Sequence, residues 1–255
     1  MARNFGNPRL TELSASDRAL NAASPFLSSP LDDDAFAKQP PGLNDTFVGT
    51  SGADDINGTE GADLMRGRGG DDTLTGDGGN DTIDGGDGRD HIEGDDGDDR
   101  LFGGGTDDFI DGEEGNDKIF GEDGSDSLDG SDGNDTIIGG QGRDTILGAD
   151  DSDKVSGAVG NDRVEGGDGN DTMAGGGNDD TFVFDGLGFE LDVIKDFVDG
   201  LETIVFTGGP DSFSELTISN NGDGDAVISY GDEGAQITVR NIQASDLSAS
   251  DFFFG

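Results

Sequence analysis

Aspartate recurs at every ninth position through more than half of the chain. Counted from Gly49, the sixth residue of each nine-residue unit is aspartate in all fifteen units up to residue 183, and Asp45 holds the same place in the segment before them. Carboxylates held in such a row repel one another unless a cation lies between them, and their oxygens are good ligands for hard cations. We therefore expect a row of cation ligands, formed by Asp45, Asp54, Asp63, Asp72, Asp81, Asp90, Asp99, Asp108, Asp117, Asp126, Asp135, Asp144, Asp153, Asp162, Asp171 and Asp180.

Three other positions of the unit predict the element that carries these aspartates. Position 1 is glycine in all fifteen units and position 4 in twelve, which permits positive φ and close backbone approach in a tight turn. Position 8 is always apolar, as expected for a three-residue strand in which only the middle side chain points inward. The pattern predicts sixteen units from about residue 40 to 183, two to each coil of a flattened right-handed spiral.

The composition makes a folded metal-free chain difficult. There are 58 acidic and 14 basic residues, a formal charge of −44, and only 30% hydrophobic residues. Chains of low hydrophobicity and high net charge stay disordered unless the charge is neutralised. The charge disfavours nucleic acid and anionic membranes as partners and favours multivalent cations. No cysteine is present, and no apolar stretch approaches the length of a membrane span.

The units resemble a known calcium-binding repeat. The segments "GGDGNDTMA" (166–174), "GSDGNDTII" (130–138) and "GGQGRDTIL" (139–147) are similar to the G-G-x-G-x-D-x-U-x nonapeptide of RTX (repeats-in-toxin, hemolysin-type) proteins. The similarity is to the C-terminal part of serralysin-like proteins, without a catalytic domain. It implies an all-β fold, a parallel β-roll with a C-terminal β cap, that holds several Ca²⁺ ions, up to about fourteen, between its turns.

The resemblance also implies which atoms bind calcium. Carboxylates 18 residues apart pair, from Asp54 with Asp72 to Asp162 with Asp180, and backbone carbonyls of the turns complete each site. The turn glycines expected to contribute are Gly67, Gly70, Gly76, Gly79, Gly85, Gly88, Gly94, Gly97, Gly112, Gly115, Gly121, Gly124, Gly130, Gly133, Gly139, Gly142, Gly157, Gly160, Gly166 and Gly169.

Some units depart from the pattern. Thr106, Asp151 and Asn178 replace the position-4 glycine. A β-branched residue does not readily adopt the left-handed conformation, so we expect a distorted turn or a weak site at 103–108, and a second doubtful site at 148–153. Thr50 and Thr59 at position 2 are interpreted as the entry into the array.

The flanks suggest a leader, a cap and an export signal. Residues 1–39 are predicted to be an N-terminal leader or cap, and 184–255 a C-terminal cap of four or five strands. The ending "ASDFFFG" resembles an uncleaved type I secretion signal, although it also fits a last strand buried in the cap. No cleavable N-terminal signal is recognisable. We expect a secreted, extracellular protein that meets a type I exporter and folds when it binds calcium outside the cell.

The sequence does not indicate an enzyme. It lacks H-E-x-x-H and G-x-S-x-G, and its one histidine, His91, occupies an outward strand position. A structural or interaction role is therefore favoured. The alternatives are a polysaccharide-binding module akin to alginate epimerase repeat modules, or a remnant of an RTX enzyme or toxin.

The outward strand positions segregate by charge. One face carries Arg66, Arg100, Lys118 and Lys154 beside Phe102, Phe120 and Ile138. The opposite face carries Glu93, Asp111, Asp129 and Glu165, together with Phe109, Leu147 and Arg163. The Arg100/Lys118/Phe120 face could dock a protein partner, the chain's own tail or an acidic polysaccharide. The alternative is a solvated sheet with cross-strand charge pairs.

Overall fold

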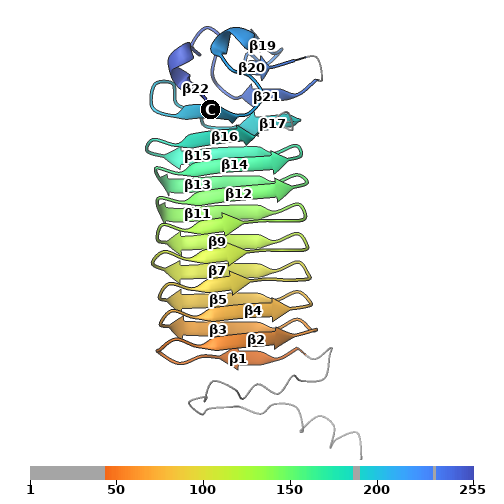
Figure 1. The fold of residues 1–255 in the computed structure, drawn as a ribbon, viewed down its shortest axis with the longest axis vertical. Coiled ribbons are helices and arrows are strands. Elements are labelled where there is room, and N and C mark those ends of the chain that lie inside the picture. The colour runs from red at the N-terminus through yellow and green to blue at the C-terminus, as the bar shows by residue number, and fades with distance from the viewer. Residues whose placement is uncertain (1–43, 186–189, 232–233) are drawn as a thin grey trace, which may run out of the picture. The chain divides into compact units, whose positions relative to one another are not determined.

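The computed structural model describes residues 44–185, 190–231 and 234–255, and within them the chain winds into a parallel β-solenoid (Figure 1). The predicted leader, residues 1–39, lies outside the described residues. Sixteen strands of the repeat region alternate between two sheets. The first sheet contains β1 (Thr46–Val48), β3 (Leu64–Gly69), β5 (Thr82–Asp87), β7 (Arg100–Gly105), β9 (Lys118–Asp123), β11 (Thr136–Gly142), β13 (Lys154–Gly160) and β15 (Thr172–Gly177). The second contains β2 (Asp55–Thr59), β4 (Thr73–Asp77), β6 (His91–Glu93), β8 (Phe109–Asp111), β10 (Ser127–Asp129), β12 (Thr145–Asp150), β14 (Arg163–Asp168) and β16 (Thr181–Asp185).

The strand register confirms two nine-residue units per coil. Neighbouring strands pair in parallel through residues 18 positions apart, as Arg100 with Lys118 in the first sheet and Phe109 with Ser127 in the second. Because successive strands belong to opposite sheets and are joined by short turns, the strands of the two sheets run in opposite directions (Figure 1). The predicted all-β parallel β-roll is therefore confirmed.

The interior of the roll is a single column of apolar side chains. All sixteen position-8 residues, from Phe47 to Phe182, are at most 7% exposed. Each such burial stabilises the fold by about 1.5–3 kcal/mol relative to an exposed side chain. One apolar residue in nine makes a narrow core, so other groups must hold the coils together.

The cap, residues 190–255, continues both sheets beyond the repeats. In the first sheet β17 (Leu191–Ile194) pairs with β15 and β21 (Gln236–Val239), and β21 leads into the antiparallel strands β20 (Ala226–Ser229) and β19 (Thr217–Asn220). In the second, β18 (Thr203–Thr207) pairs with β16 and β22 (Phe252–Phe254). The described part of the cap thus has six strands rather than the four or five predicted, because the sheets of the roll extend into it.

The core of the cap is aromatic. Phe206 contacts the rings of Phe184, Phe252 and Phe254, with ring centroids 5.8–6.4 Å apart. The helices among the described residues are two three-residue 3₁₀ turns, η1 (Phe213–Glu215) and η2 (Ala249–Asp251). Neither is long enough to cross a membrane.

Candidate metal centre

The position-6 aspartates line both edges of the roll, where each turn enters its strand. From Asp63 to Asp180 they are at most 4% exposed. One carboxylate oxygen of each accepts a backbone hydrogen bond from the aspartate one coil earlier, as the Asp99 N–H donates to Asp117 Oδ1 at 2.7 Å. The same bond, 2.6–2.9 Å long, recurs from Asp63, which accepts from Asp45, to Asp180, which accepts from Asp162. This inner ladder ties each coil to the next.

The second oxygen of most of these carboxylates is buried without a hydrogen-bond partner. Burial of an unpaired carboxylate oxygen is costly, so a ligand for these atoms is required. The oxygens concerned are the Oδ2 atoms of Asp45, Asp72, Asp81, Asp90, Asp99, Asp108, Asp117, Asp126, Asp135, Asp144, Asp153, Asp162, Asp171 and Asp180.

Burial dominates the ionisation of these aspartates. Burial, opposed by the hydrogen bond from the Asp117 N–H and assisted by neighbouring carboxylates, raises the pKa of Asp135 to about 8. Burial likewise raises the pKa of Asp99 and Asp153 to about 7. In the metal-free roll, the charged form of these groups is therefore disfavoured near neutral pH.

Backbone carbonyls lie close to the unpaired oxygens. A methyl group added to Gly94 at position 1 would lie 2.6 Å from Asp99 Oδ2 and 2.7 Å from the carbonyl oxygen of Gly112, one coil later. The absence of a side chain at position 1 therefore leaves room beside the carboxylate and the next carbonyl. The predicted position-1 glycines occupy this place, whereas position-4 glycines such as Gly133 adopt positive φ in the turn.

The first two full units provide an internal comparison. In these units position 2 is threonine. The Thr59 N–H and hydroxyl both donate to Asp63 Oδ2, at 2.8 and 3.0 Å, and the Thr50 N–H donates to Asp54 Oδ2. The entry units thus satisfy with protein donors the oxygen that stays unpaired in later units. The Thr59 hydroxyl adds a side-chain donor to this oxygen in the second full unit.

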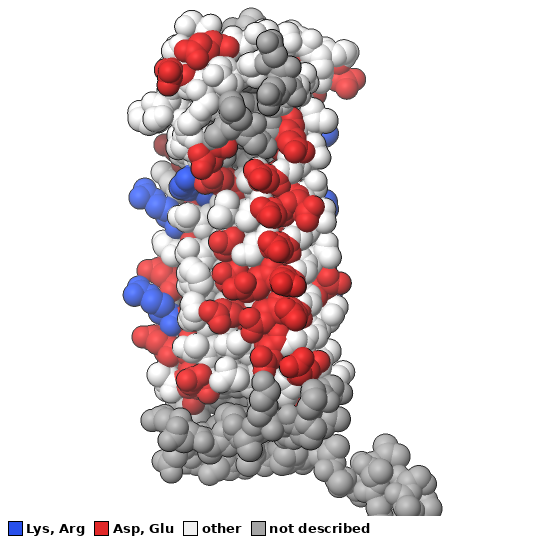
Figure 2. All heavy atoms as spheres, turned by 45° about the vertical axis from the view of Figure 1, so that its right-hand side comes forward, with Lys and Arg blue, Asp and Glu red and all other residues white. Residues whose placement is uncertain are grey.

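These atoms are suited to calcium. No group of three His, Cys, Asp or Glu side chains converges anywhere in the described residues, so side chains alone do not form a site. A carboxylate with nearby backbone carbonyls is an all-oxygen donor set, which Ca²⁺ accepts in flexible geometry with six to eight ligands. The surface has the matching charge: Figure 2 shows carboxylates gathered down the side of the roll that faces the viewer.

The comparison with protein families decides between a calcium roll and an unrelated solenoid. The RTX calcium-binding nonapeptide repeat (4 copies) matches residues 42–74, 75–110, 84–119, 93–128, 111–146, 120–155, 129–164 and 147–182. The chain belongs to the RTX calcium-binding repeat family. The expected family and its cofactor class are thereby confirmed, and the chain is a calcium-binding repeat protein.

Solved structures of RTX-type rolls are similar to this chain. The AlgE6R3 subunit of the mannuronan C5-epimerase of Azotobacter vinelandii is 26% identical, over 51% of this chain and 79% of that one, with a TM-score of 0.40. The AlgE6R2 subunit is 26% identical over 53% and 91%, with a TM-score of 0.30. The extracellular lipase LipA of Serratia marcescens is 19% identical over 85% of this chain and 41% of its own length, with a TM-score of 0.32. No curated protein matches the sequence.

The RTX carboxylate rows extend beyond the repeats that the sequence indicated. In the first sheet Asp192, 2% exposed, accepts a 2.9 Å hydrogen bond from the Asp171 N–H, and burial raises its pKa to about 7. In the second sheet Glu202 holds the corresponding place, since the adjacent Thr203 pairs with Thr181. Its Oε2 accepts a bond from the Val198 N–H, and its buried Oε1 has no hydrogen-bond partner.

Two irregularities hid these residues from the sequence analysis. The register widens from 18 residues to 21 between β15 and β17 and to 22 between β16 and β18, which breaks the nine-residue count. Glutamate also replaces aspartate. The signal that could have found them is the acid-x-apolar pattern of Asp192 to Ile194 and of Glu202 to Ile204, which repeats the spacing of positions 6 and 8.

The turn at 103–108, predicted to be distorted or to hold a weak site, keeps the carboxylate ladder, and the strength of a calcium site there stays a prediction. Thr106 itself adopts the left-handed conformation, with φ of 80°. Asp108 keeps both ladder bonds, accepting from the Asp90 N–H at 2.8 Å and donating to Asp126 at 2.9 Å. The coil on either side holds the backbone in place and the threonine follows it. Asp151, with φ of 73°, likewise leaves Asp153 in the ladder.

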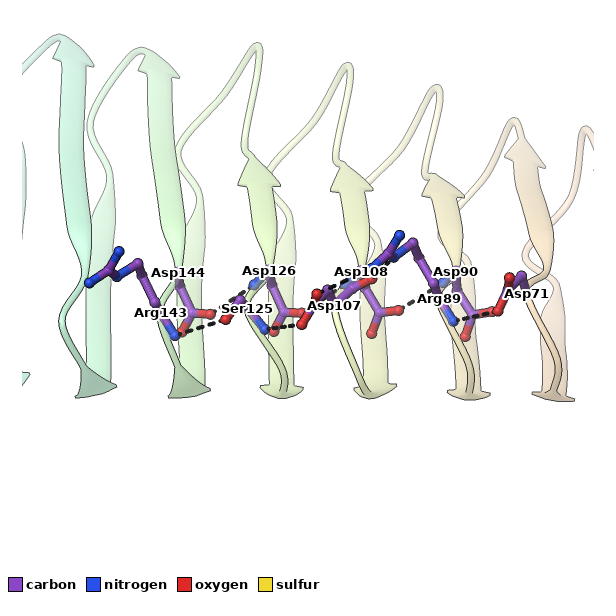
Figure 3. A network of polar contacts seen from close by, with 9 residues as sticks. All are labelled: Asp71, Arg89, Asp90, Asp107, Asp108, Ser125, Asp126, Arg143 and Asp144. Atoms are coloured by element: carbon purple, nitrogen blue, oxygen red, sulfur yellow. Dashed lines mark hydrogen bonds and ion pairs between the residues drawn. The ribbon is translucent and has the colours of Figure 1, made fainter.

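A second, outer ladder runs beside the carboxylates on both edges, through Asp107 and Ser125 on the edge drawn in Figure 3 and through Asp98 and Asn116 on the other. Here the position-5 side chain accepts from the backbone one coil later, as Asp107 does from the Ser125 N–H at 2.9 Å. Arg89 also forms an ion pair with Asp107 at 3.2 Å. The position-6 carboxylates thus accept hydrogen bonds from the preceding coil, whereas the position-5 side chains accept them from the following coil.

His91 lies where the sequence analysis expected it, on the outer side of the second sheet. Its Nε2 lies 3.2 Å from a Glu93 oxygen, and its ring stacks on Phe109 at a centroid distance of 4.8 Å.

Proposed function

We propose that this chain is a secreted RTX protein whose roll folds only when calcium binds, and which serves as a structural or interaction module rather than an enzyme. The observation that carries the proposal is the row of buried carboxylate oxygens without partners. Position-6 carboxylates and turn carbonyls are the residues that would hold the ions. The ions would supply the positive charge that the interior lacks.

The energetics favour coupling of binding to folding. Without calcium, more than a dozen buried carboxylates in two rows must either take up protons or repel one another. The unfolded chain keeps these groups in water, so the metal-free equilibrium shifts toward it at neutral pH. Binding free energy then becomes folding free energy, as in other metal-dependent domains.

Export follows from the same coupling. Extracellular calcium modules bind with dissociation constants of about 10⁻⁴–10⁻³ M, far above cytosolic calcium concentrations. The chain would stay unfolded inside the cell, pass through a type I exporter and fold outside. The last strand, β22, is partly buried in the cap, and this does not conflict with a signalling role before folding.

The test is far-UV circular dichroism of the full chain during a calcium titration, with magnesium as the control. We expect a steep coil-to-β transition near millimolar calcium and none with magnesium. A chain that is already rich in β-structure in chelator would contradict calcium-dependent folding. A second arm measures hydrolase and lyase activity on lipid, protein and polyuronate substrates, and we expect none.

A further inference from the structure

The two outer faces of the roll differ in the sign of their charge and in the strand position, 7 or 9, at which the charged residues stand. We call the outer side of the first sheet the basic face and that of the second sheet the acidic face. On the basic face, Arg100, Lys118 and Lys154 stand at position 7 and Phe102, Phe120 and Ile138 at position 9, whereas Arg66 and Asp84 occupy position 9 of two earlier strands. On the acidic face, the order is reversed: Glu93, Asp111, Asp129 and Glu165 stand at position 9, with His91 and Phe109 at position 7.

Like charges are neighbours on both faces. Arg100 pairs directly with Lys118, and Asp111 directly with Asp129, in the parallel register. Such like-charged neighbours destabilise a sheet. Among the described residues, no ion pair involves Arg100, Lys118 or Lys154. Lys118 interacts electrostatically, at longer range, with the carboxylates of Asp98 and Asp117. The ion pairs of the second sheet, Arg163 with Glu165 at 2.8 Å and His91 with Glu93 at 3.2 Å, each lie within one strand, and within the described ranges none joins outward residues of neighbouring strands.

The reversed order makes the two faces complementary. The strands of the two sheets run in opposite directions (Figure 1), so position 7 of one sheet lies over position 9 of the other. If a second copy is moved sideways, perpendicular to the sheets and without rotation, its acidic face meets the basic face of the first. The cation column then lies opposite the carboxylate column.

The heights of the charges also agree. Each of the three position-7 cations has a carboxylate eleven residues later, on the other strand of the same coil: Arg100 with Asp111, Lys118 with Asp129, and Lys154 with Glu165, which also pairs with Arg163 at 2.8 Å. The apolar columns match at one level as well, since Phe102 and Phe109 belong to the same coil. Phe102 stacks on Phe120 at 5.0 Å, which gives the basic face a flat aromatic surface, and Phe109 is 40% exposed.

We propose that the partner of the basic face is the acidic face of a second copy of this chain. The contact joins two different surfaces by a sideways translation. It is therefore heterologous and does not close on itself, and it generates rows of parallel rolls rather than a dimer.

The size of the faces sets the strength of the contact. Eight strands about 4.8 Å apart and about five residues long cover roughly 38 by 17 Å, or about 650 Å² per copy. A standard interface takes about 800 Å² per partner, so the association is weak and needs high local concentration. It also needs bound calcium, because the metal-free chain carries a net charge of −44 that repels other copies.

The experiment is sedimentation velocity of the full chain in saturating calcium at physiological ionic strength, over a series reaching high micromolar concentration. The weight-average mass of the wild type should rise with concentration. Two charge-reversal variants test the contact: Arg100→Glu/Lys118→Glu on the basic face and Asp111→Lys/Asp129→Lys on the acidic face. For each variant alone, the concentration at which half of the chains associate should rise at least about tenfold, so that it stays monomeric where the wild type associates.

The mixture of the two variants is the decisive sample. Each variant has two like-charged faces, but the faces of one complement those of the other, so the 1:1 mixture should associate again. The control is Arg68→Glu/Arg143→Glu, which makes the same charge change on exposed residues away from positions 7 and 9 and should associate as the wild type does. Calcium-dependent circular dichroism of every variant separates loss of contact from loss of folding.

Three results would overturn the proposal. One is a wild type that stays monomeric at all concentrations, and another is a mixture that stays monomeric while the wild type associates. The third is a wild type that binds polyuronate through Arg100 and Lys118 without self-association, which would assign the basic face to an acidic polysaccharide.

Discussion

In the repeat roll one side chain in nine enters an apolar core, and buried carboxylates occupy the corners. At the cap, Phe184 of β16 and Phe252 and Phe254 of β22 pack around Phe206 of β18, and β19 and β20 pair in an antiparallel hairpin. The roll therefore needs a ligand to balance its interior, whereas ordinary apolar burial stabilises the cap. The two regions share the same two sheets, so a fold can change its source of stability without changing its architecture.

Calcium removal should separate the two regions most strongly. Chelation should abolish most of the far-UV β signal, which the roll dominates. The single tyrosine, Tyr230, packs against the core of the cap, so its fluorescence reports on the cap alone. We expect the tyrosine signal to be lost at a lower calcium concentration than the far-UV signal. Loss of both at one concentration would show that the cap has no stability of its own.

Truncating one core residue in each region should have different consequences. Phe206→Ala in the cap and Ile119→Ala in the roll each remove a fully buried side chain. We expect the free energy of unfolding to fall by about 3–5 kcal/mol for the first and about 2–5 kcal/mol for the second. Raising calcium should restore the unfolding midpoint of the Ile119 variant, because bound ions add to the stability of the roll. It should leave the Phe206 variant unimproved. Thermal unfolding at two calcium concentrations gives the midpoint of each variant. An equal rise of both midpoints with calcium would contradict the difference between roll and cap.

Neutralising one carboxylate should weaken calcium binding at that site. Asp117→Asn keeps an oxygen for the Asp99 N–H but removes the charge, and should shift the calcium midpoint severalfold upward. The matched control is Asp63→Asn, where Thr59 already donates to the second oxygen, so a smaller shift is expected. Isothermal titration calorimetry distinguishes the two, and equal shifts would remove the special status of the entry units.

Acid should partly replace calcium in the roll. Burial raises the pKa of Asp81, Asp99 and Asp153 to about 7, above the ordinary value of 3.8, so the folded metal-free state binds more protons than the unfolded one. The stability of the metal-free roll therefore falls as pH rises through about 6–8 and is greatest below about 4. In chelator, β-structure should grow as pH is lowered from 8 to 5. A metal-free chain insensitive to pH in this range would contradict buried carboxylates.

The smallest effect concerns one turn. Thr106 has φ of 80°, a conformation that costs a non-glycine residue about 1–2 kcal/mol. Thr106→Gly should therefore stabilise the calcium-loaded roll by up to about 1 kcal/mol, less the added flexibility of the unfolded chain. Its counterpart Gly124→Ala should destabilise it, because the new methyl group would overlap the Thr106 carbonyl oxygen. Thermal melts in saturating calcium measure both signs.

How far the sequence predicts this molecule depends on the period. Wherever nine residues repeat without insertion, position 8 predicts the core and position 6 the buried carboxylates, because each residue has only one environment to enter. After residue 183 the insertions before Asp192 and Glu202 hide the continuing rows, since the loop length changes while the strand pairing persists. Thr106 shows the other limit: local preference predicted distortion, but neighbouring coils determine its backbone.

The interior of the roll repeats every nine residues, but its surface repeats every 18. Loss or duplication of one nonapeptide would keep an apolar residue and a carboxylate at every buried place of the roll, yet it would move all later strands to the opposite sheet. Cations and carboxylates beyond that point would change sides. A lineage that lengthens such a protein one unit at a time thus keeps the fold and scrambles the surface. Only changes in pairs of units preserve both, so the surface is the more restrictive constraint on how this chain can grow.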